Sequence, residues 1–142
     1  MNANNPLQAY KETQIKTANQ GKLIVMLYDG AIRNINLAIE LLGEKKRKLD
    51  KISNSIIKAQ DIITELIVSL DFEKGGEIAK NLFSIYIFMN RQLLEANIQK
   101  SVKPLQDVKH LLMELREAWV EVAKKVGGKA GNTGSSGVNI AG

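Results

Sequence analysis

The strongest pattern of apolar and polar positions lies in residues 17–43. Placed on a helix at 100° per residue, the apolar residues of this segment fall on two neighbouring faces. The first face holds Leu23, Met26, Leu27, Gly30, Leu37, Ala38 and Leu41, and the second holds Ile24, Tyr28, Ala31, Ile35 and Leu42. A surface helix normally buries one stripe of about 100°. Two interpretations are therefore open: a central helix covered by its own fold, or a helix that packs one face on its core and offers the other to a partner.

Three further segments show helical periodicity, and no segment shows the alternation of a strand. We expect four helices, at about residues 19–42, 51–70, 77–99 and 104–126. The second and fourth carry one apolar stripe with alternating spacings of three and four residues, typical of helices packed nearly parallel or antiparallel. The third has two stripes. The one expected in the core consists of Ile78, Leu82, Ile85, Met89, Leu93 and Ala96, and the second consists of Phe83, Ile87, Leu94 and Ile98. Short connections between helices of this length predict an all-α, antiparallel up-down-up-down four-helix bundle.

The ends of the helices and of the bundle have local signals. Asp50 is a suitable N-cap for the second helix, and Pro104 suits the first turn of the fourth. Residues 71–76 are expected to form a short turn, and Gly127 and Gly128 are expected to end the fourth helix. We therefore predict a mobile N-terminal arm at residues 1–16, a bundle at residues 17–126, and a disordered tail rich in Gly and Ser at residues 127–142.

Composition narrows the class of protein. The chain has 142 residues, which suit one domain, and it has no cysteine, which excludes disulfides and thiolate chemistry. The N-terminus lacks the apolar stretch of a signal peptide, and no apolar run approaches the ~20 residues that a membrane span needs. We expect a cytoplasmic protein that does not insert into a membrane.

The formal charge of +5 raises the alternative of a nucleic-acid-binding protein. Much of the excess positive charge lies in residues 44–51, between two helical segments and without interleaved aromatic residues. This arrangement favours a solvated loop between helices, and we expect no nucleic-acid partner.

The sequence offers no catalytic or metal-binding constellation. Its single histidine, His110, has Asp107 three residues before it and Glu114 four residues after it. Carboxylate-bridged metal sites in helical bundles draw on four facing helices and two histidines. We therefore expect a surface histidine, no metal, no cofactor and no enzymatic activity.

Several segments, in order, resemble the FliS family of flagellar secretion chaperones, which hold flagellin before its export. They include Thr17-Ala18, LIVMLYDGA at 23–31, AQDIITEL at 59–66, GGEIA at 75–79, LLEAN at 93–97 and LREAW at 115–119. The likeness runs from about residue 10 to residue 122. Where the family often has a proline after Thr-Ala-Ser, this chain has Asn19-Gln20.

The resemblance implies an antiparallel bundle that binds the disordered C-terminal segment of flagellin, prevents its premature polymerisation and aids type III secretion. It also implies that an N-terminal arm bearing a tyrosine can cover the same surface when no client is bound. The expected contacts are Tyr10, Ile15, Ala18, Leu23, Ile24, Leu27 and Tyr28, with Phe83, Ile87 and Leu94 added from the helical wheel alone. A helical adaptor or dimerisation module with a different amphipathic client is the alternative. Export-gate components as further partners, and the choice between monomer and homodimer, stay open.

Overall fold

The computed structural model describes residues 20–131, which form four helices and, within that range, no strand. The helices are α2 (Gln20–Leu42), α3 (Leu49–Val68), α4 (Phe72–Gln99) and α5 (Lys103–Gly131). The predicted all-α class and the four-helix architecture are confirmed. The N-terminal arm predicted at residues 1–16, and residues 132–142 of the predicted tail, lie outside the described residues.

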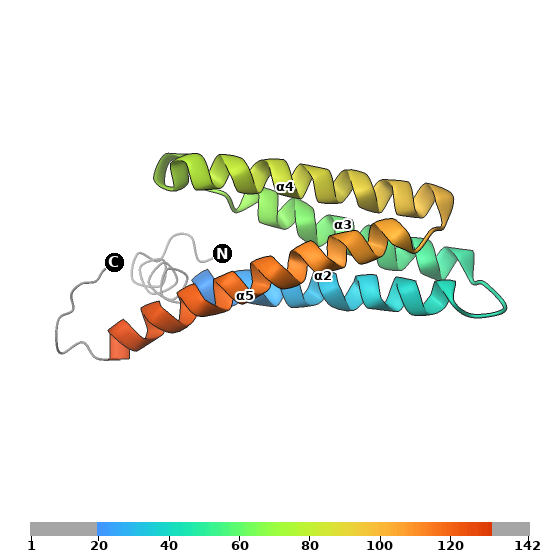
Figure 1. Cartoon of the computed structure of the whole chain (residues 1–142), viewed down its shortest axis with the longest axis horizontal. Helices are drawn as coiled ribbons and strands as arrows, with labels where there is room; N and C mark the ends of the chain where they lie inside the picture. Colours follow the sequence, from blue (N-terminus) through green and yellow to red (C-terminus); the bar gives the residue numbers. More distant parts are fainter. Residues whose placement is uncertain (1–19, 132–142) are drawn as a thin grey trace, which may run out of the picture. The chain divides into compact units, whose positions relative to one another are not determined.

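The chain divides into two compact units. The larger one, Leu27–Arg116, contains α3, α4, most of α2 and residues 103–116 of α5, and its helices alternate in direction along one long axis (Figure 1). The described part of the smaller unit consists of residues 20–26 of α2 and 117–131 of α5. Within the smaller unit the two segments approach closely, because a Cβ atom at Gly21 would lie only 2.9 Å from the Cβ atom of Ala123.

The core of the larger unit contains apolar side chains from all four helices. The largest fully buried side chains are Tyr28, Tyr86, Ile35, Ile52, Ile56, Ile63, Leu66, Met89, Leu93, Leu105, Leu112 and Val108. The stripe predicted for α3 is buried from Ile52 to Leu66. Gly30 allows α2 and α3 to pack closely, since a Cβ atom there would lie 3.1 Å from Cδ1 of Ile62.

The start of α3 differs from the prediction. The helix begins at Leu49, its N-cap position is Lys48, and the backbone N–H of Ile52 donates to the carbonyl of Lys48 over 3.0 Å. Asp50 therefore lies in the first turn and does not act as the N-cap. Its negative charge there interacts favourably with the positive end of the helix dipole.

The start of α4 combines the predicted turn with an additional helical turn. Asp71 is the N-cap and accepts hydrogen bonds from the backbone N–H groups of Glu73 and Lys74, each over 3.0 Å. Gly76 then interrupts the helix with φ +48° and ψ −123°, a conformation that favours glycine. Regular helix follows from Glu77, as the sequence predicted.

The end of α5 also differs, because the helix includes Gly127 and Gly128 and continues to Gly131. Each glycine costs about 1 kcal/mol in a helix interior. Extending an established helix is far easier than nucleating one, so a long helix can include such residues.

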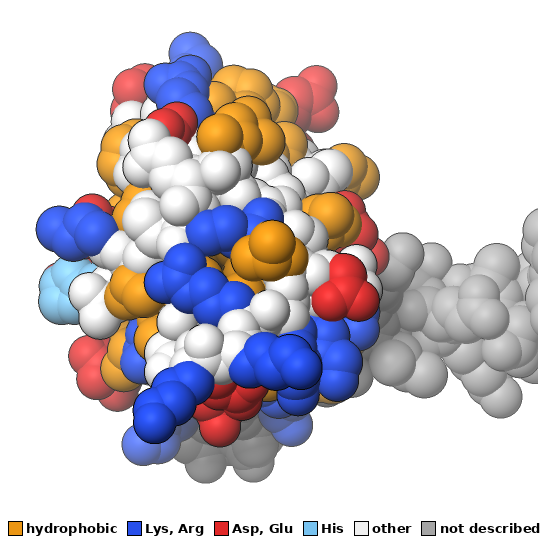
Figure 2. Space-filling model, turned by 90° about the vertical axis from the view of Figure 1, so that its right-hand side faces the viewer, with side chains coloured by type: hydrophobic (Ala, Val, Ile, Leu, Met, Phe, Trp, Pro, Cys, Tyr) orange, Lys and Arg blue, Asp and Glu red, His pale blue; other side chains and the backbone are white. Residues whose placement is uncertain are grey.

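The connections at residues 43–48 and 100–102 lie at the same end of the larger unit. Figure 2 looks onto this end and shows Lys and Arg side chains gathered across it, with hydrophobic side chains between them. The described helices include none that is both long enough and apolar enough to cross a membrane.

Candidate functional site

A row of polar contacts joins α3 to α4. The hydroxyl of Ser53 donates to Oδ1 of Asn97 over 3.0 Å, and the amide of Asn90 donates to the hydroxyl of Thr64 over 3.3 Å. Nε2 of Gln60 donates to the backbone carbonyl of Asn90 over 3.4 Å. These bonds fix the register of the antiparallel pair and define which residues lie at the same level on the two helices.

The register brings exposed apolar residues of the two helices to the same level. Ile57 lies between Ser53 and Gln60 on one face of α3, and Leu94 lies between Asn90 and Asn97 on one face of α4. Because these polar neighbours are hydrogen-bonded to one another, Ile57 and Leu94 lie opposite each other beside the line of contact between α3 and α4. Their exposed fractions are 45% and 51%.

Further apolar side chains extend this surface along α4. Phe83, Ile87 and Ile98 share the helical face of Leu94, and Phe83 and Ile98 are exposed while Ile87 is half-buried. By the same register, Val68 at the end of α3 lies level with the Phe83 region. We call these residues, together with Phe72, the α3–α4 apolar surface: Ile57, Val68, Phe72, Phe83, Ile87, Leu94 and Ile98.

Phe72 joins the surface through a ring contact. Its ring centroid lies 5.9 Å from that of Phe83, with the planes at 69°, an edge-to-face arrangement. The cap by Asp71 positions the turn that carries Phe72, so a capped first turn supports part of the surface.

Ile78 was expected in the core stripe of this helix but is exposed. The register explains the difference, because α3 ends at Val68 and Ile78 lies beyond its end. Tyr86, which the stripe omitted, occupies the core instead.

Two of the residues expected to bind the client lie in the core. Tyr28 has no exposed surface, Ile24 is 6% exposed, and the hydroxyls of Tyr28 and Tyr86 lie 2.6 Å apart in a hydrogen bond. Burial raises the pKa of Tyr86 above its usual value, and the hydrogen bond with Tyr28 opposes that shift. The placement of Ile24 and Tyr28 on an accessible face is therefore corrected: these side chains face inward.

The other face of α2 is accessible only in part, because Ala38 and Leu41 on it are buried. In the smaller unit Leu23 is exposed, and in the larger unit Leu27 is half-buried and Leu37 is exposed. Tyr10, Ile15 and Ala18, also expected to bind the client, lie outside the described residues. Phe83, Ile87 and Leu94, by contrast, do lie together on the α3–α4 apolar surface.

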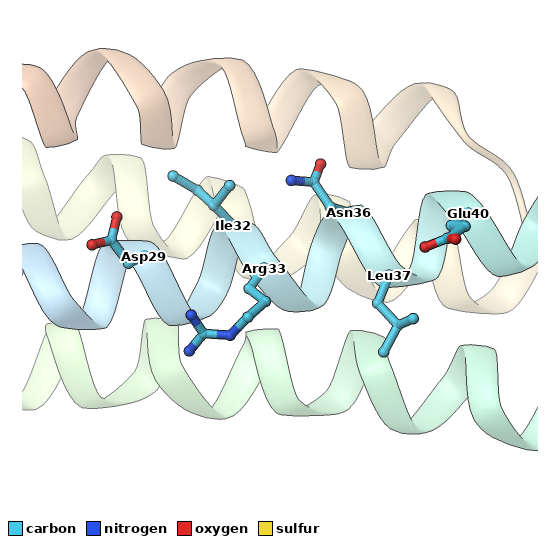
Figure 3. A pocket seen from close by; sticks show the side chains of 6 residues that line it. All are labelled: Asp29, Ile32, Arg33, Asn36, Leu37 and Glu40. Carbon is cyan, nitrogen blue, oxygen red and sulfur yellow. The ribbon is translucent and has the colours of Figure 1, made fainter.

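An open groove of about 580 Å³ runs along the outer side of α2 (Figure 3). It is lined by Asp29, Ile32, Arg33, Asn36, Leu37 and Glu40. Arg33 and Leu37 extend toward α3, whereas Ile32 and Asn36 extend toward α5. The lining mixes charged, amide and apolar groups from a single helix, which suits contact with a peptide better than enclosure of a small ligand.

One charged residue of this groove, Asp29, is paired with α5. The guanidinium of Arg116 on α5 binds both carboxylate oxygens of Asp29, through Nε and, over 3.4 Å, through Nη2. His110 is exposed, with Nε2 3.4 Å from the carboxylate of Glu114, while the carboxylate of Asp107 binds Lys103. Within residues 20–131 no three His, Cys, Asp or Glu side chains are grouped so that they could hold a metal ion.

Sequence reasoning missed Ile57, Val68 and Phe72 as members of the surface. The sequence does show that Ile57 and Val68 lie off the apolar stripe of α3. Only the register between α3 and α4 shows that this position is next to the exposed apolar residues of α4. Phe72 had no signal, because residues 71–76 were interpreted as a turn without a helical first turn.

Comparison with known proteins identifies relatives over most of the chain. A family model described as "Flagellar protein FliS" matches residues 3–126. The flagellar secretion chaperone FliS of Bacillus subtilis is 32% identical over 115 residues, covering 81% of this chain and 84% of the relative. The chaperone of the same name from Salmonella typhimurium is 36% identical over 119 residues, covering 83% and 87%. That of Campylobacter jejuni is 31% identical over 122 residues, covering 86% and 94%.

Proposed function

This chain belongs to the FliS family of flagellar proteins, and on that premise we propose that it binds the C-terminal segment of flagellin in the cytosol before export. Its named relatives are flagellar secretion chaperones. By holding a segment that is disordered before assembly, the protein prevents premature polymerisation and keeps flagellin ready for export.

The observation that carries this proposal is the α3–α4 apolar surface. Seven apolar side chains lie on the two packed helices, and Phe83, Leu94 and Ile98 among them are exposed by 39%, 51% and 70%. Contiguous exposed apolar surface usually marks a site for a partner. An apolar surface formed by two packed helices can bind the apolar side of an amphipathic helix.

The client contacts divide into three groups. Phe83, Ile87 and Leu94 contact the client from α4, and Leu23 and Leu27 contact it from α2. Ile24 and Tyr28 act from the core by supporting α2. Tyr10, Ile15 and Ala18 remain proposed contacts on the strength of the family resemblance.

Binding of this kind couples folding to association. A disordered segment that folds over a broad surface typically buries ~1,000–3,000 Å² and spends ~2–5 kcal/mol of the interaction energy on ordering. The complex is then specific but still releasable, as export requires.

Calorimetric titration of the full chain with the last ~50 residues of flagellin from the same source tests the proposal. We expect one-to-one binding with a negative heat-capacity change, the marker of apolar burial. A copy without residues 1–16 should bind with a different affinity if Tyr10 and Ile15 contact or cover the site. Absence of binding in both copies would overturn the flagellin assignment and favour a different amphipathic client or a second copy of this chain.

A further inference from the structure

The connection between α2 and α3 carries an exposed concentration of positive charge. Every residue from 43 to 51 is exposed. Two acidic residues, Glu44 and Asp50, oppose five basic ones, which leaves +5 − 2 = +3 in this segment. The basic residues are Lys45, Lys46, Arg47, Lys48 and Lys51. None of these five forms an ion pair with any residue that the structure describes.

Two lysines lie at the same end, Lys100 in the connection between α4 and α5 and Lys103 at the start of α5, and both have polar partners. The ammonium of Lys100 donates to the hydroxyl of Ser53 over 3.0 Å and to Oδ1 and the backbone carbonyl of Asn97, each over 2.7 Å. Lys103 pairs with Asp107 over 2.6 Å. Figure 2 shows the resulting gathering of Lys and Arg side chains across this end.

The opposite end of the larger unit has the opposite sign. Residues 71–77 contain Asp71, Glu73 and Glu77 against Lys74, a net charge of 1 − 3 = −2. The long axis of the larger unit therefore carries a charge asymmetry. An anionic surface would attract the end with the basic connections and repel the end with the α3–α4 turn.

One apolar side chain lies inside the basic segment. Leu49, between Lys48 and Asp50, is 55% exposed although it opens α3. Lysines and arginines beside an exposed leucine are the composition that binds membrane interfaces, where the charges meet lipid headgroups and the apolar side chain enters the acyl boundary.

We propose that this end of the larger unit binds the surface of bilayers containing anionic phospholipids. The basic segment has no aromatic residue on which nucleic-acid bases could stack, which disfavours single-stranded RNA or DNA. An acidic protein would use the charges but would leave the exposed Leu49 unexplained. The protein would lie on the membrane without inserting a helix.

The test is co-sedimentation of the full chain with vesicles of phosphatidylcholine alone and of phosphatidylcholine mixed with phosphatidylglycerol. We expect binding only to the anionic vesicles, weakening steeply as the salt concentration rises and the Debye length falls below about 8 Å. Each basic residue near an anionic surface raises the partition coefficient about fivefold. The quadruple variant K45Q, K46Q, R47Q and K48Q should therefore lose at least ~100-fold in partition coefficient.

Matched variants separate a defined site from general charge. The variant K58Q, K74Q, K80Q and R91Q removes the same charge from exposed positions elsewhere. It should bind within about fivefold of the unmodified chain, because those positions lie more than a Debye length from the end that contacts the membrane. Leu49→Ser should lower the partition coefficient at least ~5-fold, since it removes three carbon atoms from the apolar contact. All these positions are exposed, so circular dichroism should show unchanged helix content.

Three results would overturn the inference. The first is equal binding to neutral and anionic vesicles or to neither, and the second is an equal loss in the two quadruple variants. The third is tighter binding to polyadenylate RNA or polyglutamate than to anionic vesicles, with no effect of Leu49→Ser. None of the basic residues belongs to the α3–α4 apolar surface, so titration with flagellin should be unchanged and either proposal can fail alone.

Discussion

The hydroxyls of Tyr28 and Tyr86 form a polar contact inside a mainly apolar core. Both side chains are buried, and the oxygen atoms lie 2.6 Å apart. A buried hydroxyl without a hydrogen-bond partner would cost free energy, and the bond between the two tyrosines avoids this cost. It also links α2 to α4 at one defined level and thereby helps to fix which face of each two-faced helix points outward.

The raised pKa of Tyr86 gives this contact a pH dependence. Because burial raises the folded-state pKa above 10.0, the unfolded chain releases the proton at lower pH than the folded chain does. The contribution to stability is therefore complete below pH 10.0 and is lost as the pH rises above that value toward the folded-state pKa.

Tyr86→Phe should lower the free energy of unfolding by about 1 kcal/mol at neutral pH, because it removes one buried hydrogen bond. The variant should also lose stability less steeply than the unmodified chain above pH 10.0. Urea unfolding followed by circular dichroism at several pH values measures both effects. Identical alkaline slopes for the two proteins would contradict the role given to Tyr86.

At the scale of elements, the start of α4 shows how local capping shapes a surface. Asp71 caps one helical turn, Gly76 interrupts the helix, and the first turn carries Phe72 to the ring of Phe83. The position of Phe72 thus depends on a cap and on a glycine conformation as well as on packing.

Asp71→Ala should cost about 1 kcal/mol of stability, the usual effect of losing an N-cap. It should also weaken flagellin binding modestly, since the Phe72 ring is no longer held against Phe83. Asp71→Asn is the matched control, because asparagine caps helices about as well as aspartate does. Thermal unfolding and calorimetric titration measure the two effects, and equal behaviour of both variants would argue against the cap as the cause.

The positions of the helices were largely predictable from the sequence. Which apolar face of a helix with two such faces is buried was not predictable. The stripe on α3 is regular and single, so its buried residues from Ile52 to Leu66 could be assigned from spacing alone. On α2 the wheel shows two apolar faces without saying which one is inner. Ile24 and Tyr28 are inner because Tyr28 meets Tyr86, a contact between residues 58 positions apart that local periodicity does not contain.

The helix ends were less predictable for a similar reason. The continuation of α5 through Gly127 and Gly128 follows from the preceding length of helix more than from the glycines themselves. The α3–α4 apolar surface needed the register between two helices. That register is set by Ser53, Thr64, Asn90 and Asn97, whose side chains gave no signal in the sequence.

At the scale of the whole molecule, two different surfaces lie on the larger unit. The α3–α4 apolar surface extends along two helices, whereas the basic segment at residues 43–51 lies at one end. An apolar surface suits a folding client and a basic one suits an anionic surface, so the two need not compete. On the two proposals together, the protein holds flagellin with one surface while the other rests on a membrane.

The most direct test of the central claim is calorimetric titration of two matched variants with the C-terminal segment of flagellin. Leu94 on the α3–α4 apolar surface and Met113 on α5 are each 51% exposed. Leu94→Asp and Met113→Asp thus place the same charge at equally accessible positions and should both keep the helix content of the unmodified chain.

If the α3–α4 apolar surface holds the client, Leu94→Asp should weaken binding at least ~30-fold, the effect expected at an interface hot spot. Met113→Asp should bind like the unmodified chain. Unchanged affinity of a folded Leu94→Asp variant, or an equal loss in Met113→Asp, would contradict the account.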